Sequence, residues 1–403
     1  MGSNNRAIVL IWGGYPPMIG GGSARIYRVT KYLSDFLRIY LFTQKVKTTR
    51  TIENYDNLKV IRLPPSNPKT DKSKHIIYYM QMFISLLIMI MRIILLYPLL
   101  LLVCSKTKPI AIIKEATTWD FGIIEEKIKV RFLFLLFKPW VVVSKLLKIP
   151  LYVYFTNLWY HKEHIEYLST KLRYADCIIV VDLWMKEFLK HKFDFRKPIY
   201  YIPVSIDLND FKKNNLEFPT EIKILFVARL TPERGCDTLI KAVPYIIKEV
   251  SDIKVEIVGD GYQKRSLMKL AKELGVDNYV TFRGEVHPQE IQQVYDGAKV
   301  FINSLRVPGI GNVTIEAMAS GVPVVKSMIG PMQNEPIIEG INGYSFEMDD
   351  YEDLADKIIK ILRMDEERWN EMSRNDRKTA EKYNIQKISQ KMLQCLVHDE
   401  GNS

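Results

Sequence analysis

Cysteine is scarce in this sequence, and the cysteines lie far apart. Cys104, Cys177, Cys236 and Cys395 are the four among 403 residues, and no Cys-x-x-Cys pair occurs. Neither a disulfide framework nor a structural zinc site with the usual cysteine spacing is therefore expected. The pattern fits a protein of a reducing compartment.

A secretory signal and low-complexity tracts are also lacking. The start, MGSNNRAIVLIW, has one basic residue and a short apolar run that ends at Gly13-Gly14, without the length or cleavage site of a signal peptide. We interpret this run as the first strand of a domain. No internal repeat is apparent, and a composition of 47% hydrophobic and 26% charged residues is typical of a folded soluble protein.

Acidic residues are too few to balance the basic ones. The net charge is +11 and the pI is about 9.2. Such an excess favours an anionic partner, which can be nucleic acid, an anionic lipid surface or a phosphorylated small molecule. Nucleic acid is disfavoured because the basic residues lie among apolar runs and no nucleic-acid-binding module is recognisable.

The chain is too long for one core, so two domains are expected. From residue 222 onward, strand-like runs such as IKILFVAR and KVEIVGDG alternate with segments of helical spacing, and the first half shows a rougher form of the same alternation. We therefore predict an α/β fold of two Rossmann-like domains that face a central cleft, with ligands at the carboxyl ends of the strands. A polar, turn-rich stretch near 205–220 sets the expected boundaries. These are 1–205, 206–383, and a C-terminal helix over 384–403 that packs back on the first domain.

The stretch VPGIGNVTIEAMASGVPVV (307–325) follows the predicted strand KVFINSL and predicts a loop, a helix and another strand. A helix start offers unpaired backbone N–H groups, and Gly309 and Gly311 let a phosphate approach them closely. Glu316 lies within the first two turns and suits a neutral hydroxyl beside that phosphate. The alternative is that Glu316 only complements the helix dipole.

The stretch FVARLTPERGCDTLIKA (226–242) follows the first strand of the second domain. Arg229 lies at the strand end, and Arg234 lies at the next helix start. Two fixed guanidinium groups there favour a diphosphate-binding clamp, while surface arginines in an ordinary loop are the alternative. VGDGY (258–262) is a further glycine loop at a strand end, which by itself is a weak signal.

These stretches occur together in a familiar order. RLTPERGCDTLIKA, VGDG, FRG and PGIGNVTIEAMASGVPVV resemble the motifs of the retaining family 4 glycosyltransferases (glycosyl transferases group 1), which have the GT-B fold. The resemblance is strong over residues 222–347 and looser in the first half, through GYPPMIGGGSAR and YIPVSID.

The resemblance implies roles for individual residues. Arg229 and Arg234, the latter in place of the usual lysine, would bind the donor diphosphate and stabilise its charge as it leaves. Glu316 would hold the ribose hydroxyls. The backbone near Arg283 and Gly284 would face the base, and the first-domain loop would lie beside the donor phosphates and sugar. The implied donor-binding residues are Gly21, Gly22, Arg25, Arg229, Arg234, Gly259, Arg283, Gly284, Gly309, Gly311, Asn312, Val313 and Glu316.

The sequence departs from the family pattern at two places. Pro308 stands where the family has a second glutamate that contacts the donor sugar, and Thr156-Asn157 stands where many members have a histidine. His161 and His164 follow and, with Asn157, are candidates for contact with the acceptor or the sugar. A solvated helix face is the alternative for the histidine pair. A metal site is not expected, because no third ligand is evident.

Two apolar segments stand out in the first half. Residues 76–105 carry Arg92 as their only charge, and 127–148 contain six Lys or Arg and no acid. For 76–105 we consider a membrane span, a buried helix, and a helix docked on the membrane surface, which is favoured. Arg131, Lys138 and Lys145 recur every seven residues, which suits an anionic lipid surface, although Pro139 interrupts any single helix.

The resemblance, together with the features above, implies a retaining, metal-independent glycosyltransferase of the hexosyltransferase type without a cofactor. A UDP- or GDP-linked sugar would bind residues 206–383, and a lipid-linked glycan or glycolipid acceptor would bind residues 1–205. We expect a cytoplasmic protein that is peripherally associated with an anionic membrane surface. The alternative function, motivated by the two departures from the family pattern, is a non-catalytic nucleotide-sugar-binding scaffold of a membrane glycan pathway.

Overall fold

The chain forms two compact units, which are Met1–Pro203 with Ser389–Ser403, and Val204–Ile388. The computed structural model describes residues 6–12, 15, 21–46, 49–63, 95–115, 139–155, 172, 174–193, 195–211, 218–287, 290–329 and 335–398. The predicted sites at Asn157, His161, His164, Arg131 and Lys138 lie outside these residues.

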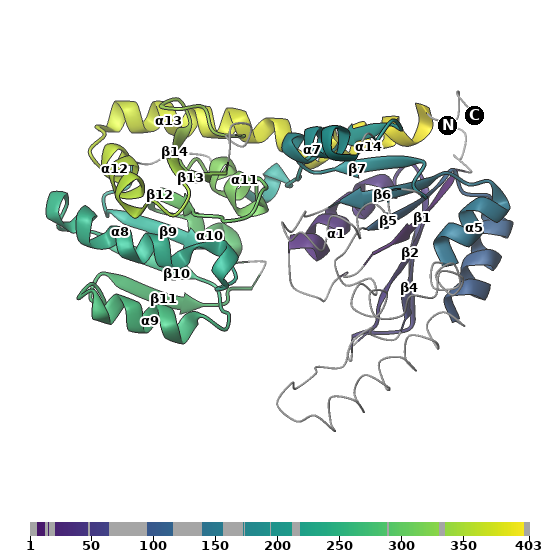
Figure 1. Cartoon of the computed structure of the whole chain (residues 1–403), viewed down its shortest axis with the longest axis horizontal. Coiled ribbons are helices and arrows are strands. Elements are labelled where there is room, and N and C mark those ends of the chain that lie inside the picture. Colours follow the sequence, from purple (N-terminus) through teal and green to yellow (C-terminus); the bar gives the residue numbers. More distant parts are fainter. Residues whose placement is uncertain are drawn as a thin grey trace, which may run out of the picture. The chain divides into compact units, whose positions relative to one another are not determined.

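The first unit is built on an eight-stranded sheet with the order β3-β4-β2-β1-β5-β6-β7-β8 (Figure 1). All its strand pairs are parallel except β3 with β4. β1, β6 and β7 are buried along their whole length, as expected of parallel strands with helices on both faces. The elements are β1 (Ala7–Ile11), α1 (Gly21–Leu33), β2 (Arg38–Gln44), β3 (Ile52–Tyr55), β4 (Leu58–Leu63), β5 (Ala111–Glu115), α5 (Pro139–Leu147), β6 (Leu151–Phe155), β7 (Cys177–Val180), α7 (Leu183–Phe193) and β8 (Ile199–Tyr201).

The described part of the long apolar segment is a helix over residues 95–107. Leu96, Leu100 and Cys104 recur at helical spacing and pack into the core of the first unit. Leu95 and Leu102 remain 42% and 50% exposed. In the described stretches of the chain, no helix is both long and apolar enough to cross a membrane.

The second unit is built on a six-stranded, all-parallel sheet with the order β11-β10-β9-β12-β13-β14. The first strand, β9, lies at the centre, and the strand order reverses between β9 and β12. The elements are η1 (Leu208–Phe211), β9 (Lys223–Val227), η2 (Pro232–Arg234), α8 (Cys236–Glu249), β10 (Lys254–Val258), α9 (Lys264–Glu273), β11 (Val280–Gly284), α10 (Ile291–Tyr295), β12 (Ala298–Asn303), α11 (Asn312–Ala319), β13 (Val324–Met328), β14 (Gly343–Glu347), α12 (Tyr351–Leu362), α13 (Glu366–Ala380), η3 (Glu381–Tyr383) and α14 (Ile385–His398), whose later residues belong to the first unit.

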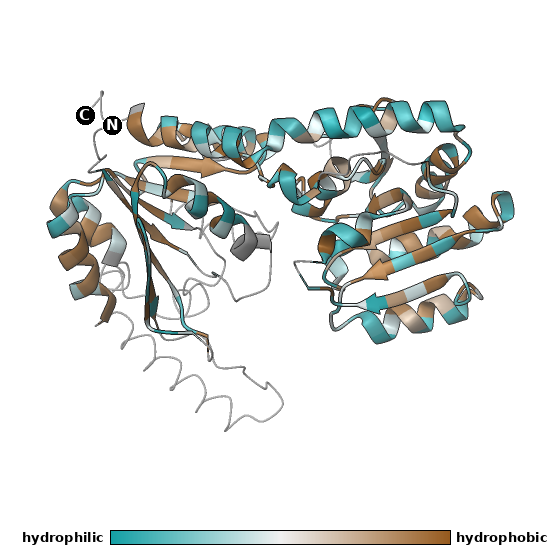
Figure 2. Cartoon of the chain, turned by 180° about the vertical axis from the view of Figure 1, so that it is seen from behind, coloured by the Kyte–Doolittle hydropathy of each residue, from teal (hydrophilic) through white to brown (hydrophobic). Residues whose placement is uncertain are grey.

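Alternate residues of β9 pack into two separate hydrophobic clusters. Ile224 and Phe226 pack in one cluster with α8 and α12, while Leu225 and Val227 pack in the other with α11. Because both faces of the sheet are covered, the strand reads as a continuous apolar run. Figure 2 shows the strands mainly in the brown of hydrophobic residues, whereas α13 is mainly teal. The prediction of two Rossmann-like α/β domains is confirmed.

Helix α13 contains a carboxyl group that is costly to ionise. Asp376 is fully buried, and neither of its oxygens has a hydrogen-bond partner within the described residues. Burial raises its pKa well above 3.8. The folded state therefore holds a proton that the unfolded chain releases near its ordinary pKa, so stability falls as the pH rises above that value.

We expect Asp376→Asn to raise the melting temperature at pH 7 and to have little effect near pH 3.5. Below the unfolded pKa the aspartic acid is neutral in both states, whereas above it the wild type loses about 1.4 kcal/mol per pH unit until the folded-state pKa is reached. Thermal unfolding from pH 3.5 to 8 measures this difference. A gain that is constant across the pH range would contradict the assignment.

Candidate active site at the strand-order reversal

The loops after β9 and β12 meet where the strand order of the second sheet reverses. In parallel α/β sheets this is the place where ligands bind. Gly235 has a φ of 66°, and a Cβ atom there would lie 2.0 Å from the carbonyl oxygen of Ser304. Ser304 Oγ in turn donates to the carbonyl oxygen of Gly235 at 2.8 Å. Only glycine permits this backbone contact, which fixes the two loops against each other.

Arg229 lines an open cavity in the second unit. The side chain is exposed at the end of β9, and the cavity has a volume of about 380 Å³ with Asp260, Gly261 and Glu285 as its other lining residues. A Cβ at Gly261 would lie 2.2 Å from the carbonyl oxygen of Leu230, so the VGDG loop packs directly on the Arg229 loop. The weak VGDG signal thus marks a wall of the same cavity.

The two carboxylates of this cavity were not anticipated from the sequence. Asp260 accepts hydrogen bonds from its neighbour Gly261 N–H at 2.7 Å and from Lys264 at 3.2 Å. These two bonds lower the pKa of Asp260, with the backbone bond as the larger cause. Asp260 is therefore an anion that already has donors, which leaves Arg229 able to bind a separate anion.

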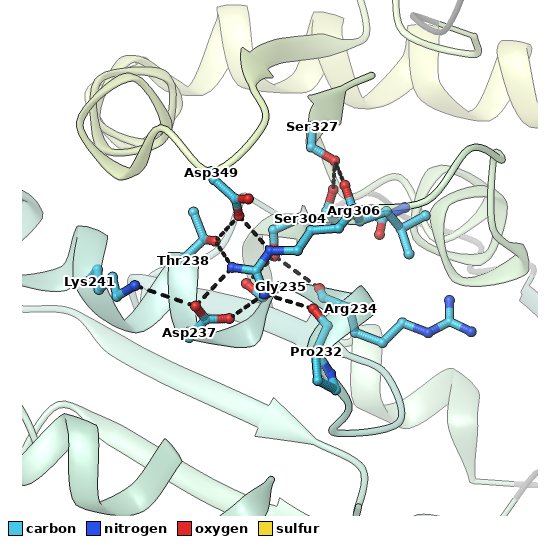
Figure 3. Close-up of polar contacts among 12 residues, drawn as sticks. Pro232, Arg234, Gly235, Asp237, Thr238, Lys241, Ser304, Arg306, Ser327 and Asp349 are labelled. Carbon is cyan, nitrogen blue, oxygen red and sulfur yellow. Dashed lines mark hydrogen bonds and ion pairs between the residues drawn. The ribbon is translucent and has the colours of Figure 1, made fainter. Parts of the chain in front are cut away.

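Arg234 is the last residue of the short helix η2. It lies close enough to Arg229 for the two charges to interact. Burial lowers the pKa of Arg234, Glu233 opposes this effect, and the charge of Arg229 adds to the lowering. Its Nε is buried and has no partner within the described chain. In Figure 3 the guanidinium group of Arg234 points away from the hydrogen-bonded contacts around Arg306. Two neighbouring cations of this kind are suited to a doubly charged anion.

Glu316 is held inside the second turn of α11. It is 7% exposed, and Oε2 accepts a hydrogen bond from the Tyr295 hydroxyl at 3.1 Å. The start of the same helix is more accessible, because Gly311, Asn312 and Val313 are only half-buried. Helix α11 therefore presents its N–H groups and, just behind them, an oriented carboxylate.

The loop before α11 contains the position at which the sequence departs from the family pattern. Gly309 and Gly311 have positive φ angles of 140° and 76°. Pro308, which directly precedes Gly309, is buried. The position of the missing glutamate is thus filled by an apolar ring that is turned away from solvent. The polar groups that this loop offers are those of its backbone.

Arg283 and Gly284 end β11 beside the cavity. The Arg283 side chain pairs with Glu256 at 3.1 Å, while the carbonyl oxygen of Gly284 accepts from Gly259 N–H at 2.8 Å. The backbone of Gly284 thus leads directly into Glu285, which lines the cavity.

The first-unit residues occupy a different setting. Gly21 and Gly22 begin α1. Arg25 is 4% exposed and donates to the carbonyl oxygens of Ile202 and Pro203 at 2.9 and 2.7 Å, so it fastens α1 to the segment after β8. Among the residues that the structure describes, no cluster of three or more metal-ligating side chains occurs.

The Tyr295–Glu316 bond provides a test of the carboxylate's orientation. Tyr295 is 1% exposed, and a phenylalanine fills nearly the same volume. A hydrogen bond to a charged group contributes about 1.5–3 kcal/mol, so we expect Tyr295→Phe to weaken nucleotide binding about tenfold. Titration calorimetry measures this loss, and Tyr279→Phe on the opposite face of the sheet is the matched control. Equal binding by the two variants would contradict the role.

Comparison with known proteins shows what the second unit is similar to. Residues 208–379 match the family model described as "Glycosyl transferases group 1". A Methanocaldococcus jannaschii protein described as an uncharacterized glycosyltransferase is 35% identical over 192 residues, which are 44% of this chain and 48% of that protein. A GDP-mannose-dependent phosphatidylinositol monomannoside mannosyltransferase of Mycobacterium tuberculosis is 28% identical over 207 residues, which are 47% of this chain and 53% of that protein. The chain thus spans about half the length of the curated relatives it matches.

Solved structures extend the likeness to both units. Sucrose-phosphate synthase from Thermosynechococcus elongatus matches with a TM-score of 0.75 and 20% identity, over 99% of this chain and 100% of that chain. An Anabaena protein crystallised in complex with UDP matches with a TM-score of 0.67 and 16% identity, over 98% and 100% of the two chains. The chain has the GT-B fold of these proteins, and the match to the family model lies within its second unit.

Proposed function

We propose that this protein transfers a sugar from a nucleoside diphosphate donor to an acceptor with retention of anomeric configuration. The observation that carries the proposal is the pair Arg229 and Arg234 at the strand-order reversal, next to the start of α11. Such an arrangement offers two cations and the N–H groups of a helix start to one diphosphate. The likeness to a GDP-mannose-dependent transferase and to a protein that binds UDP supports a nucleotide sugar as the donor.

The proposed reaction uses these groups as follows. The acceptor oxygen forms a bond to the anomeric carbon while the bond from that carbon to the diphosphate oxygen breaks. The proton of the acceptor passes to the leaving phosphate, so no protein nucleophile is required. Arg229, Arg234 and the N-terminal end of α11 stabilise the charge that develops on the diphosphate, and Glu316 accepts hydrogen bonds from the ribose hydroxyls.

The donor sugar is held without a glutamate at position 308. Backbone N–H groups around Gly309 and Gly311 take over part of this contact, because the Pro308 side chain is apolar and buried. Binding through backbone groups selects less sharply between hexoses than a carboxylate does, so we expect more than one nucleotide sugar to bind.

The proposed acceptor is a lipid-linked glycan or glycolipid. The first unit is proposed to bind the cytoplasmic surface of a membrane. The exposed leucines of this unit support the proposal, since Leu102 and Leu146 are 50% and 66% exposed. One relative acts on phosphatidylinositol monomannoside. Lys145 of the expected basic stripe pairs with Asp176 at 2.8 Å, so its charge is partly compensated.

The test is incubation of the purified chain with a panel of UDP- and GDP-linked sugars and a polyprenyl-linked or glycolipid acceptor. We expect release of nucleoside diphosphate with at least one donor, and a product whose anomeric configuration, determined by NMR, equals that of the donor. Inversion would contradict the mechanism. Nucleotide-sugar binding without transfer or hydrolysis would instead support the non-catalytic scaffold, the second candidate, which the missing glutamate favours.

Transfer is expected to persist in the presence of EDTA. The two arginines and the helix start supply the positive charge that a divalent cation supplies in other transferases. Initial rates with EDTA and with added magnesium or manganese measure this independence. Abolition by EDTA with recovery on metal addition would contradict it.

A further inference from the structure

Arg306 joins several segments of the second unit through its guanidinium group. It forms a two-pronged ion pair with Asp237, with Nη1 and Nη2 each 2.8 Å from a carboxylate oxygen. Nε donates to Asp349 Oδ1 at 2.6 Å, and Nη1 also donates to the carbonyl oxygen of Pro232 at 2.7 Å. Figure 3 shows these contacts converging on Arg306 from the η2 loop, the first turn of α8 and the loop before α12.

Further bonds close this cluster. Thr238 Oγ1 donates to Asp349 Oδ1 at 3.1 Å, and Lys241 lies 3.5 Å from Asp237. The backbone N–H of Arg306 donates to the carbonyl oxygen of Glu233 at 2.9 Å. Burial acts to raise the pKa of Asp237, but the hydrogen bond and charge of Arg306 outweigh it and the pKa is lowered. Both members of the pair are therefore charged around neutral pH.

Asp349 shows that the surrounding structure maintains this arrangement. Its φ angle is 66°, in the left-handed region that non-glycine residues seldom occupy. A conformation of this kind persists where the neighbouring contacts hold it. Here those contacts are the bonds of its carboxylate to Arg306 and Thr238.

The position of Arg306 in the chain gives the cluster its significance. Arg306 precedes the loop that carries Gly309 and Gly311, and its side-chain and backbone partners Pro232 and Glu233 immediately precede Arg234. The residue thus ties the loop of one proposed diphosphate contact to the loop of the other. Its own guanidinium group is occupied by carboxylates and is not available to a phosphate.

We propose that Arg306 is a positioning residue that sets the distance between Arg234 and the start of α11, and thereby the affinity for a diphosphate group. This inference rests on the proposed function of the same site. The fork of an arginine matches a carboxylate, whereas a lysine keeps only the charge. Arg306→Lys should therefore loosen the geometry while preserving the electrostatic balance of the cluster.

The experiment compares the binding of UDP, GDP and the corresponding nucleosides to wild type and Arg306→Lys by titration calorimetry. We expect a loss of about tenfold for the nucleoside diphosphate that wild type binds, and less than twofold for its nucleoside. In an Arg234→Ala background, Arg306→Lys should have little further effect, because it acts through Arg234. Arg363→Lys is the control, since Arg363 forms an exposed ion pair with Glu249. Both residues of this pair lie outside the two loops.

A second variant and a second readout separate positioning from a general loss of stability. Asp237→Asn removes the charge that holds Arg306 with little change in shape, and should reproduce the selective loss of diphosphate affinity. Hydrogen exchange should quicken in residues 232–238 and 307–311 of either variant and remain unchanged in α9. Equal losses for nucleoside and nucleoside diphosphate, or additive effects of Arg306→Lys and Arg234→Ala, would overturn the inference. Absence of UDP and GDP binding by wild type would overturn the proposed function itself.

Discussion

Arg229→Ala and Arg234→Ala are each expected to reduce transfer by roughly ten- to a hundredfold, because a hydrogen bond to a charged group contributes about 1.5–3 kcal/mol. The loss in the double variant should fall short of the product of the single losses, since both side chains bind one diphosphate. Initial rates at saturating acceptor measure these effects, with Arg363→Ala as the matched control.

Removal of one arginine of this pair should not lower the stability of the ligand-free protein, although it lowers activity. The charge of Arg229 contributes to the lowered pKa of Arg234, so the two cations repel each other in the empty site. We therefore expect Arg229→Ala to leave the melting temperature of the ligand-free protein unchanged or slightly raised. Strictly multiplicative small losses of activity, together with a lowered melting temperature, would mean that the arginines are structural surface residues.

Glu316→Gln is expected to weaken donor binding and transfer by roughly ten- to a hundredfold, for the same loss of a charge-assisted hydrogen bond. The glutamine keeps the shape of the side chain, so the fold should remain intact. Michaelis constants for the donor measure the effect. Glu273→Gln, which removes an exposed partner of Lys269 in α9, is the control.

A nucleotide without the 2′ and 3′ hydroxyls of the ribose tests whether Glu316 binds those hydroxyls. Wild type and Glu316→Gln should bind 2′,3′-dideoxy-UDP with similar affinity, because the hydroxyl partners of the carboxylate are then missing. A variant that is as active as wild type would contradict the ribose assignment. A loss of equal size for UDP and for the dideoxy analogue would mean that Glu316 supports the helix rather than the ligand.

The central elements of the second unit were readable from the sequence. Its strands are buried on both faces and therefore appear as continuous apolar runs between helical segments. Arg229, Arg234 and Glu316 are candidates from their places at strand ends and a helix start, and the family resemblance implies their roles. The structure adds the strand order, which puts the loops of β9 and β12 side by side.

The contacts that orient these residues had no local signal. Tyr295 precedes Glu316 by 21 residues, and Arg306 lies 69 residues from Asp237 and 43 from Asp349. Such pairs form only once the sheet has brought the loops together. Arg25 illustrates the same limit, because it binds carbonyl groups 177 and 178 residues away in the chain.

Titration of UDP, GDP, uridine and guanosine into the wild-type chain and Arg234→Ala tests most directly whether the strand-order reversal is a nucleoside diphosphate site. We expect wild type to bind one of the two diphosphates at least about tenfold more tightly than its nucleoside, since two charged donors contact the added phosphates. This advantage should largely disappear in Arg234→Ala, while the affinity for the nucleoside stays the same. Wild-type protein that binds neither diphosphate more tightly than its nucleoside would contradict the site.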